Sequence, residues 1–398
     1  MSEWASKTLG DLITLQRGFD ITKSKQNAGQ YPVISSGGIA SYHDAFMAEG
    51  PGVVIGRKGT LGTAFYVEGS YWPHDTTLWV KDFKGNDARF IYYLLKSISL
   101  ERLDSGSANP TLNRNYAHLI QTTAPVPAVQ QKIAAVLSAL DAKIDLNNRI
   151  NAELEALAET IYDYWFVQFD FPDAEGLPYK TNGGKMVWND ALKREIPAGW
   201  EVGPLGRWLT FKRGISYRSA EICGEGTPLI NLNSFRLDGS VKLEGTKQFS
   251  GKFRDDQRVA PGDLVIAITD VTRNAAIIGK AFVVPDLFGE SPLISCDVAS
   301  VFGGGALPAY YLERLFNSSE YHSYIRYFAS GTLVLHLNLD GMQWFETFAP
   351  PQPLLGQYCD IVESARKMIT ANHTQNRELT QLRDWLLPLL MNGQVSVA

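Results

Sequence analysis

Two stretches of the chain repeat apolar residues at alternating steps of four and three positions. This spacing is typical of a coiled-coil seam, because it keeps these residues on the helix face that meets a partner helix. The first seam consists of Ile133, Leu137, Leu140, Ile144, Asn147, Asn151, Leu154, Ala158 and Ile161. The second consists of Tyr358, Val362, Ala365, Ile369, Asn372, Asn376, Leu379, Arg383 and Leu386. Proline-rich segments precede both seams and suit a helix start, so the pattern predicts two long helices.

Two asparagines lie near the middle of each seam, Asn147 and Asn151 in the first helix and Asn372 and Asn376 in the second. A buried asparagine lowers stability but fixes the register, since a misaligned partner leaves its amide unpaired. Antiparallel packing with Asn147 opposite Asn376 and Asn151 opposite Asn372 also aligns four apolar layers. Parallel packing would match the amides as well, and two independent surface helices are a further alternative. The tandem repeat described below favours the antiparallel pair.

Shorter β-branched and alternating runs predict strands outside the helices. Residues 53–69, VVIGRKGTLGTAFYVEG, indicate a β-hairpin with a Gly-rich turn between two strands. A matching hairpin is expected in DLVIAITDVTRNAAIIGKAFVV, which follows Pro261 and Gly262. Its turn is expected to contain Thr269, Asp270, Thr272, Arg273 and Asn274.

The chain carries two copies of one unit, which is the mark of a repeat architecture. Trp4, Leu9, Gly10, Thr14, Arg17 and Gly18 recur 196 positions later as Trp200, Leu205, Gly206, Thr210, Arg213 and Gly214. Near the end of each copy the offset has grown to 225, as between Asn113 and Asn338. The second copy therefore contains 29 additional residues.

These patterns predict an α+β protein with two mixed β-rich domains in a pseudo-twofold tandem repeat. Two long helices, packed as an antiparallel coiled coil, would separate the domains. The expected parts are a first domain at 1–127, a central helix at 128–166, a linker at 167–199, a second domain at 200–352 and a C-terminal helix at 353–391.

Composition limits the possible partners and compartments. The 37 basic and 42 acidic side chains give a net charge of −5, whereas phosphate binding favours a basic face. Residues 124–170 carry three basic and seven acidic side chains, so part of the acidity falls on the first helix. The three cysteines have no CxxC spacing, which argues against a zinc site or a disulfide framework. With no secretory signal and no apolar span of roughly 20 residues, we expect a cytoplasmic protein without a membrane segment.

Three segments resemble a known family. They are APVPAVQQKIAAVLSALDAKIDLNNRINAELEALAETIYDYWF, YKTNGGKMVWNDALKREIPAGWE and LRDWLLPLLMNGQV. They resemble the spacer regions of type I restriction-modification specificity subunits, and the resemblance covers the whole chain. It implies two target-recognition domains, each binding one half of a bipartite site in double-stranded DNA, with the helix pair setting the gap.

The resemblance also implies partner subunits. Two methylase subunits would dock on the chain, with restriction subunits added to them. S-adenosylmethionine, ATP and magnesium are expected on those partners, and no cofactor is expected on this chain.

The candidate DNA-binding residues are polar side chains in and beside the predicted turns. Arginine can fork onto guanine, lysine can pair with phosphate, and glycines let the backbone approach closely. The candidates are Arg57, Lys58, Thr60, His74 and Thr76 in the first domain and Thr269, Asp270, Thr272, Arg273 and Asn274 in the second. Different turns on a repeated scaffold would suit two different half-sites. Solvated or structural turns are the alternative, and the same choice applies to the equivalent Ser-Gly segments 105–114 and 330–339.

Recognisable catalytic and metal motifs are missing from the sequence. The string Asn109-Pro110-Thr111 lacks the second proline and the aromatic residue of an adenine methylase motif, and no phosphate-binding loop or metal-ligand spacing is found. We therefore expect a non-catalytic specificity subunit of an adenine-specific DNA methyltransferase and type I site-specific deoxyribonuclease complex. Two alternatives are a same-fold subunit of a modification-only or orphan system and an unrecognised β-rich enzyme.

Overall fold

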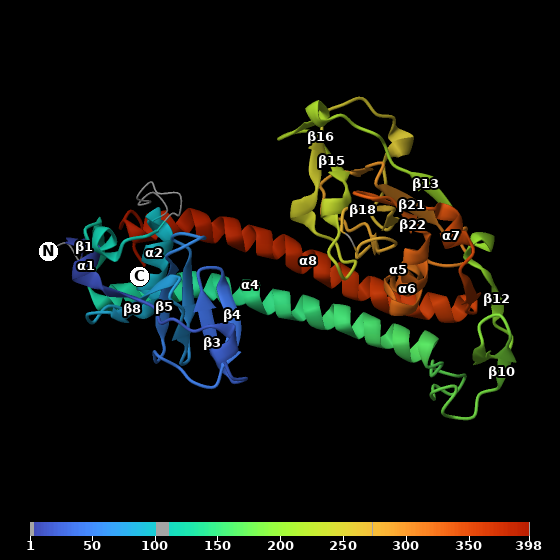
Figure 1. The fold of residues 1–398 in the computed structure, drawn as a ribbon, viewed down its shortest axis with the longest axis horizontal. Helices are drawn as coiled ribbons and strands as arrows, with labels where there is room; N and C mark the ends of the chain where they lie inside the picture. The colour runs from blue at the N-terminus through green and yellow to red at the C-terminus, as the bar shows by residue number, and fades with distance from the viewer. Residues whose placement is uncertain (1–3, 101–110, 273, 398) are drawn as a thin grey trace. The chain divides into compact units, whose positions relative to one another are not determined.

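The computed structural model describes residues 4–100, 111–272 and 274–397. The chain divides into two compact units. The first combines two separate stretches of sequence, and the second is the stretch between them. Unit 1 comprises Met1–Asn147 and Gln375–Ala398, and unit 2 comprises Asn148–Thr374. Both division points lie within long helices, so each unit contains part of both helices (Figure 1).

Unit 1 is a β-rich domain with short helices and two long helical segments. Its strands are β1 (Trp4–Thr8), β2 (Thr14–Arg17), β3 (Tyr31–Ser35), β4 (Gly38–His43), β5 (Gly52–Gly56), β6 (Ala64–Val67), β7 (Trp72–Pro73), β8 (Thr77–Asp82) and β9 (Gln121–Pro125). Its helices are α1 (Leu9–Leu12), α2 (Ala88–Ser97), α3 (Arg114–His118), the first part of α4 (Pro127–Tyr162) and the last part of α8 (Gln352–Met391).

The main sheet of unit 1 has the strand order β2-β8-β5-β6 and is antiparallel. A second sheet has the order β4-β3-β7, with β3 parallel to β7, and β1 pairs with β9. Leucine, isoleucine and valine side chains of the main sheet pack on α2 in one core. The same core includes Ile133 and Leu137 of α4 and Leu390 of α8, so the long helices complete the domain.

Unit 2 repeats this plan with more residues. Its strands are β10 (Met186–Asn189), β11 (Arg194–Pro197), β12 (Glu201–Pro204), β13 (Thr210–Arg213), β14 (Ile222–Cys223), β15 (Thr227–Ile230), β16 (Lys247–Phe249), β17 (Leu264–Ala267), β18 (Thr269–Asp270), β19 (Ala281–Val283), β20 (Leu293–Ile294), β21 (Val298–Phe302), β22 (Ala329–Ser330), β23 (Leu335–Leu337) and β24 (Glu346–Ala349). Besides its parts of α4 and α8, its helices are α5 (Ala309–Asn317), α6 (Ser319–Ile325) and α7 (Leu339–Gln343).

The sheets of unit 2 correspond strand by strand to those of unit 1. The order β13-β21-β17-β19 matches β2-β8-β5-β6, and β15 runs parallel to β20 as β3 does to β7. The pair β12 and β24 likewise matches β1 and β9. The predicted α+β fold with two β-rich copies is therefore confirmed.

Strand register shows where the 29 additional residues of the second copy lie. Equivalent residues, identified by their cross-strand partners, are Ile34 and Ile230, Val54 and Val265, Phe65 and Phe282, Leu78 and Ala299, and Asn113 and Asn338. The offset between copies rises through 196, 211, 217, 221 and 225 in this series. The extra residues are thus divided among four connections, and the paired strands keep their register.

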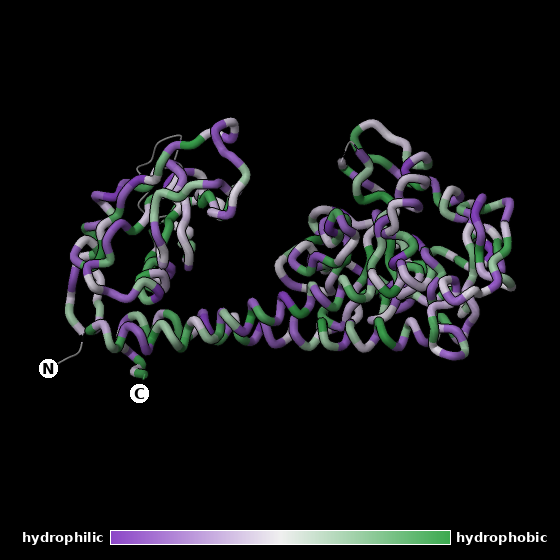
Figure 2. The backbone as a smooth tube through the Cα atoms, turned by 90° about the horizontal axis from the view of Figure 1, so that it is seen from below, coloured by the Kyte–Doolittle hydropathy of each residue, from purple (hydrophilic) through white to green (hydrophobic). Residues whose placement is uncertain are grey.

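The long helices pack antiparallel within each unit. In unit 1, Nδ2 of Asn147 donates to Oδ1 of Asn376 at 2.9 Å and to Oε1 of Gln375 at 2.8 Å. In unit 2, Nδ2 of Asn372 donates to Oδ1 of Asn151 at 2.8 Å. These are the pairs expected for antiparallel helices. Hydrophobic and hydrophilic segments alternate along both helices, as a seam with a polar outer face requires (Figure 2).

The segment expected to be a linker, 167–199, contains regular structure. Strands β10 and β11 form an antiparallel hairpin in which Asn189 lies opposite Arg194. The Asn189 side chain accepts hydrogen bonds from two backbone N–H groups of the turn, which explains why the chain reverses there. Across the described ranges, none of the helices is long and apolar enough to cross a membrane.

Candidate nucleic-acid interface

The Gly-rich hairpin predicted in the first domain is present as β5 and β6. Its connection carries Arg57, Lys58 and Thr60, of which Lys58 and Thr60 are exposed and Arg57 is half-buried. A Cβ atom on Gly56 would lie 1.9 Å from the Thr60 carbonyl oxygen, so the close turn requires glycine at that position. The turn therefore holds two basic side chains on a tightly folded backbone.

A second segment, His74 to Thr76, lies against this turn. The backbone N–H groups of Arg57 and Lys58 both donate to the Thr76 carbonyl oxygen, at 2.9 and 3.1 Å. Nδ1 of His74 lies 3.0 Å from Oγ1 of Thr76 and 3.2 Å from Oδ1 of Asp75. All five residues predicted for the first domain are thus brought to one place, and Asp75 joins them.

Arg17, at the end of β2, completes this cluster. Its Nη2 lies 2.7 Å from Oδ2 of Asp75, in an ion pair between a half-exposed arginine and a carboxylate that is 18% exposed. Nη1 of Arg57 is 3.5 Å from the Asp75 carbonyl oxygen. Both guanidinium groups therefore contact Asp75, that of Arg17 at the carboxylate and that of Arg57 at the backbone carbonyl.

The pKa shifts of Arg57 and Asp75 agree with the close packing of these charged groups. Burial, and after it repulsion by Arg17, lowers the pKa of Arg57. Burial tends to raise the pKa of Asp75, but the hydrogen bond from Arg17 and nearby positive charges, Lys58 among them, leave it below its usual value. The cluster formed by Arg17, Arg57, Lys58 and Asp75 carries more positive than negative charge, which suits a phosphate or the acceptor edge of a base.

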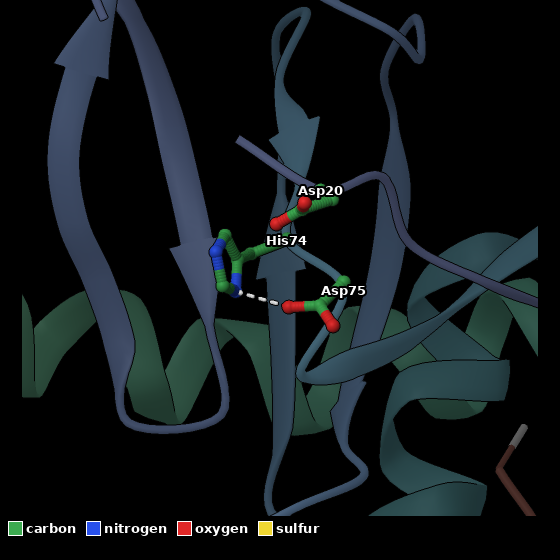
Figure 3. Close-up of side chains that lie close together, drawn as sticks. All are labelled: Asp20, His74 and Asp75. Carbon is green, nitrogen blue, oxygen red and sulfur yellow. Dashed lines mark ion pairs between the residues drawn. The ribbon is translucent and has the colours of Figure 1, made fainter. Parts of the chain in front are cut away.

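Asp20, His74 and Asp75 also offer ligand atoms within 4.8 Å of one another (Figure 3). A divalent cation would need both carboxylates available. Asp75 is already paired with Arg17, and Lys58 adds a further positive charge nearby. This arrangement favours an anionic or polar ligand over a metal ion, so the cluster fits DNA chemistry better than metal chemistry.

In the second domain the structure corrects two predicted residues. Thr269 and Asp270 lie in strand β18 instead of a turn, and they are 3% and 0% exposed. Both carboxylate oxygens of Asp270 accept backbone N–H groups, from Thr272 at 2.5 Å and Ile277 at 2.6 Å. Such a buried, fully used carboxylate shapes the following loop and is not available to a ligand.

The other residues predicted in the second domain lie in that loop. Thr272 is half-buried, and its hydroxyl accepts the Ala276 N–H at 3.1 Å, so it also stabilises the loop. Asn274 is exposed and remains a candidate for DNA contact. Arg273 lies outside the described residues.

The Ser-Gly segment of the second domain contains an exposed turn. Ser330 ends β22, and residues 331–334 form the exposed turn that leads into β23. Most of the equivalent segment, 105–110, lies outside the described residues.

Arg17, Asp20 and Asp75 were not among the predicted site residues. The signal for Arg17 was its recurrence as Arg213 in the sequence repeat. Asp75 stands between two predicted residues, but only the folded chain brings it to Arg17, 58 positions away.

The chain is similar to proteins of one known family. A family model described as the type I restriction modification DNA specificity domain matches residues 1–156. The MjaIX type I specificity subunit of Methanocaldococcus jannaschii is 26% identical over 314 residues, covering 78% of this chain and 69% of that protein. The HindI specificity subunit of Haemophilus influenzae is 22% identical over 328 residues, covering 72% and 71%. The chain is thus similar to the type I restriction-modification specificity subunits over most of its length.

A solved structure has the same fold as this chain. The S subunit of a type I restriction-modification system from M. genitalium has a TM-score of 0.63 at 16% identity. The match covers 98% of this chain and 96% of that chain. The resemblance predicted from the spacer segments is confirmed, and the names of the relatives agree with a specificity role instead of a catalytic one.

Proposed function

We propose that this specificity subunit reads a bipartite DNA site, with one half-site bound by each β-rich domain. The observation that carries the proposal is a repeated sheet with different side chains at equivalent points. Arg57 of unit 1 corresponds to Ile268 of unit 2, since the carbonyl of each accepts the N–H of an equivalent leucine, Leu112 or Leu337. By register, His74 likewise corresponds to Ser295. One scaffold with two sets of side chains suits two half-sites.

In the first domain, the proposed DNA contacts are Arg57, Lys58, Thr60, His74 and Thr76. In the second, they come from the loop after β18, where Asn274 is an exposed polar residue. Arg57→Ala should relax one base position by about 1–3 kcal/mol if Arg57 reads a base. A uniform loss across all sequences would instead assign Arg57 to a phosphate.

The partners in this proposal are two methylase subunits and the restriction subunits of a cytoplasmic complex. Those subunits would carry S-adenosylmethionine, ATP and magnesium. They would also supply phosphate contacts, which offsets the net charge of −5 on this chain.

The decisive experiment is to express the chain together with its neighbouring genes and to map methylated adenines in the host DNA. We expect one bipartite motif. Replacing residues 1–123 by the corresponding region of a relative should change one half of the motif and leave the other intact. A continuous motif, or a change in both halves, would contradict the two-domain proposal.

The helix pair is proposed to set the gap between the half-sites. Adding seven residues to each seam keeps the heptad and lengthens each helix by about 10 Å. This corresponds to roughly three base pairs of duplex. The unread gap in the methylated motif should increase while both half-sites stay the same, and an unchanged gap would rule out a spacer role.

A further inference from the structure

Arg17 and Arg213 occupy equivalent backbone positions in the two domains. The residue that follows each is a glycine held in the same way. Gly18 N–H donates to the Thr77 carbonyl and Gly214 N–H to the Val298 carbonyl, at 3.1 and 3.0 Å. A Cβ atom on Gly18 would lie 2.1 Å from the His74 carbonyl oxygen, and one on Gly214 would lie 2.1 Å from the Ile294 carbonyl oxygen, so neither position can accept a side chain without a shift.

The surroundings of the two arginines are different. Arg17 is paired with Asp75, whereas strand register places Cys296 at the position equivalent to Asp75. Within the described residues, no carboxylate lies within ion-pair distance of Arg213, which is exposed. The repeat therefore keeps the arginine and changes its neighbour.

A carboxylate beside an arginine changes what that arginine can recognise. It fixes the direction of the guanidinium fork, and a fixed fork is what the two acceptors of a guanine edge require. It also offsets part of the positive charge that would attract phosphate. The Arg17 side chain is 54% exposed and has donors beyond the Nη2 that binds Asp75, so it can present them to a base.

We propose that Arg17 reads a guanine in the first half-site, that Asp75 is its positioning residue, and that Arg213 contacts a backbone phosphate of the second half-site. This assignment rests on the proposed function, because it needs each domain to bind one half-site. Neither arginine was among the predicted contacts.

The test uses the complete methylase complex and plasmids in which every base of the mapped motif is varied. Arg17→Lys keeps the charge but removes the fork, and it should reduce discrimination at one base of the first half-site by about tenfold to a hundredfold. Asp75→Asn should reduce discrimination at the same base. The second half-site should remain fully discriminated in both variants, which also shows that they fold and assemble.

Arg213 is expected to behave differently. Arg213→Lys should keep all base preferences, whereas Arg213→Ala should lower methylation of all sequences alike and weaken the salt dependence. Arg89→Lys in unit 1 and Arg207→Lys in unit 2 are matched controls, because each replaces a partly exposed arginine paired with a glutamate away from the cluster.

Full discrimination by Arg17→Lys, or an equal loss on all sequences, would overturn the role of Arg17. Unchanged discrimination in Asp75→Asn would overturn the positioning role. A change of base preference in Arg213→Lys would contradict the phosphate contact. If the unmodified chain gives no bipartite motif at all, the proposed function fails instead, and the two failures are distinguishable.

Discussion

Asn147 of α4 donates a hydrogen bond to Asn376 of α8 across the seam of unit 1. Asn147 is fully buried, so its amide depends on protein partners. Asn147→Leu should destabilise the protein by about 1–3 kcal/mol, because Asn376 and Gln375 lose this donor. The double variant Asn147→Leu/Asn376→Leu should recover stability through apolar packing. Denaturant unfolding of the single and double variants measures the coupling, and additive effects would contradict it.

Gly18 and Gly37 offer a matched pair of substitutions in unit 1. A Cβ atom on Gly18 would lie 2.1 Å from the His74 carbonyl oxygen, whereas nothing lies within 4 Å of one on Gly37. Gly18→Ala should cost about 1–3 kcal/mol or more, and Gly37→Ala should stay within about 0.5 kcal/mol. Thermal unfolding compares them, and equal melting temperatures would mean that the strand end can move aside.

His118 makes stability depend on pH. Its Nε2 accepts the Leu15 backbone N–H at 2.9 Å, which requires the neutral ring. Burial, and then the charges of Lys84 and Arg114, lower the pKa of His118 below 6.5. The unfolded chain therefore binds the proton first, and the stabilisation present above about pH 6.5 is lost as pH falls through the folded-state value.

The corresponding variant is His118→Gln. Between pH 7.5 and 5.5 the free energy of unfolding should fall less in this variant than in the unmodified chain. A slope remains, because burial also lowers the pKa of His322 and His373. Identical slopes in both proteins would exclude His118 as a source of the pH dependence.

Two adjacent residues of α8 in unit 2 form ion pairs, Arg366 a buried one and Lys367 an exposed one. Nη2 of Arg366 lies 2.8 Å from Oε2 of the buried Glu313, whose other oxygen accepts the Val283 N–H. Lys367 pairs with Glu363 at the surface. Arg366→Met should cost about 3–5 kcal/mol, because it leaves a buried carboxylate without its cation.

Lys367→Met is the control, with an expected change within about 0.5 kcal/mol. Both variants remove one positive charge from neighbouring positions of the same helix. Equal losses of stability, measured by denaturant unfolding, would show that net charge and not burial decides the outcome.

Periodic features were predicted well from the sequence. The seams, the asparagine pairs and the β5–β6 hairpin each depend on short-range spacing, which the sequence displays directly. Thr269 and Asp270 occupy the position of the first-domain turn, but the sequence does not show that they are buried there in strand β18. Cross-strand partners align Thr269 with Lys58, since both carry the backbone pairing to equivalent residues, His336 and Thr111.

The site itself was predicted in part. The first-domain residues lie together, but the ion pair between Arg17 and Asp75 joins distant strands and has no periodic signal. The segment around Asp270 has the composition of a ligand-binding turn, and only the burial of Asp270 distinguishes this segment from such a turn. Burial and long-range pairing are properties of the folded chain, which a single sequence does not state.

The division of the 29 additional residues among four connections bears on the ancestry of the molecule. If both copies descend from one duplicated gene segment, divergence has lengthened the loops and left the register of the paired strands unchanged. New targets can then arise through changes in surface connections, without redesign of the sheet that supports them. A chain built in this way can exchange one half with a related gene and still fold, so recombination offers a direct route to new DNA specificities.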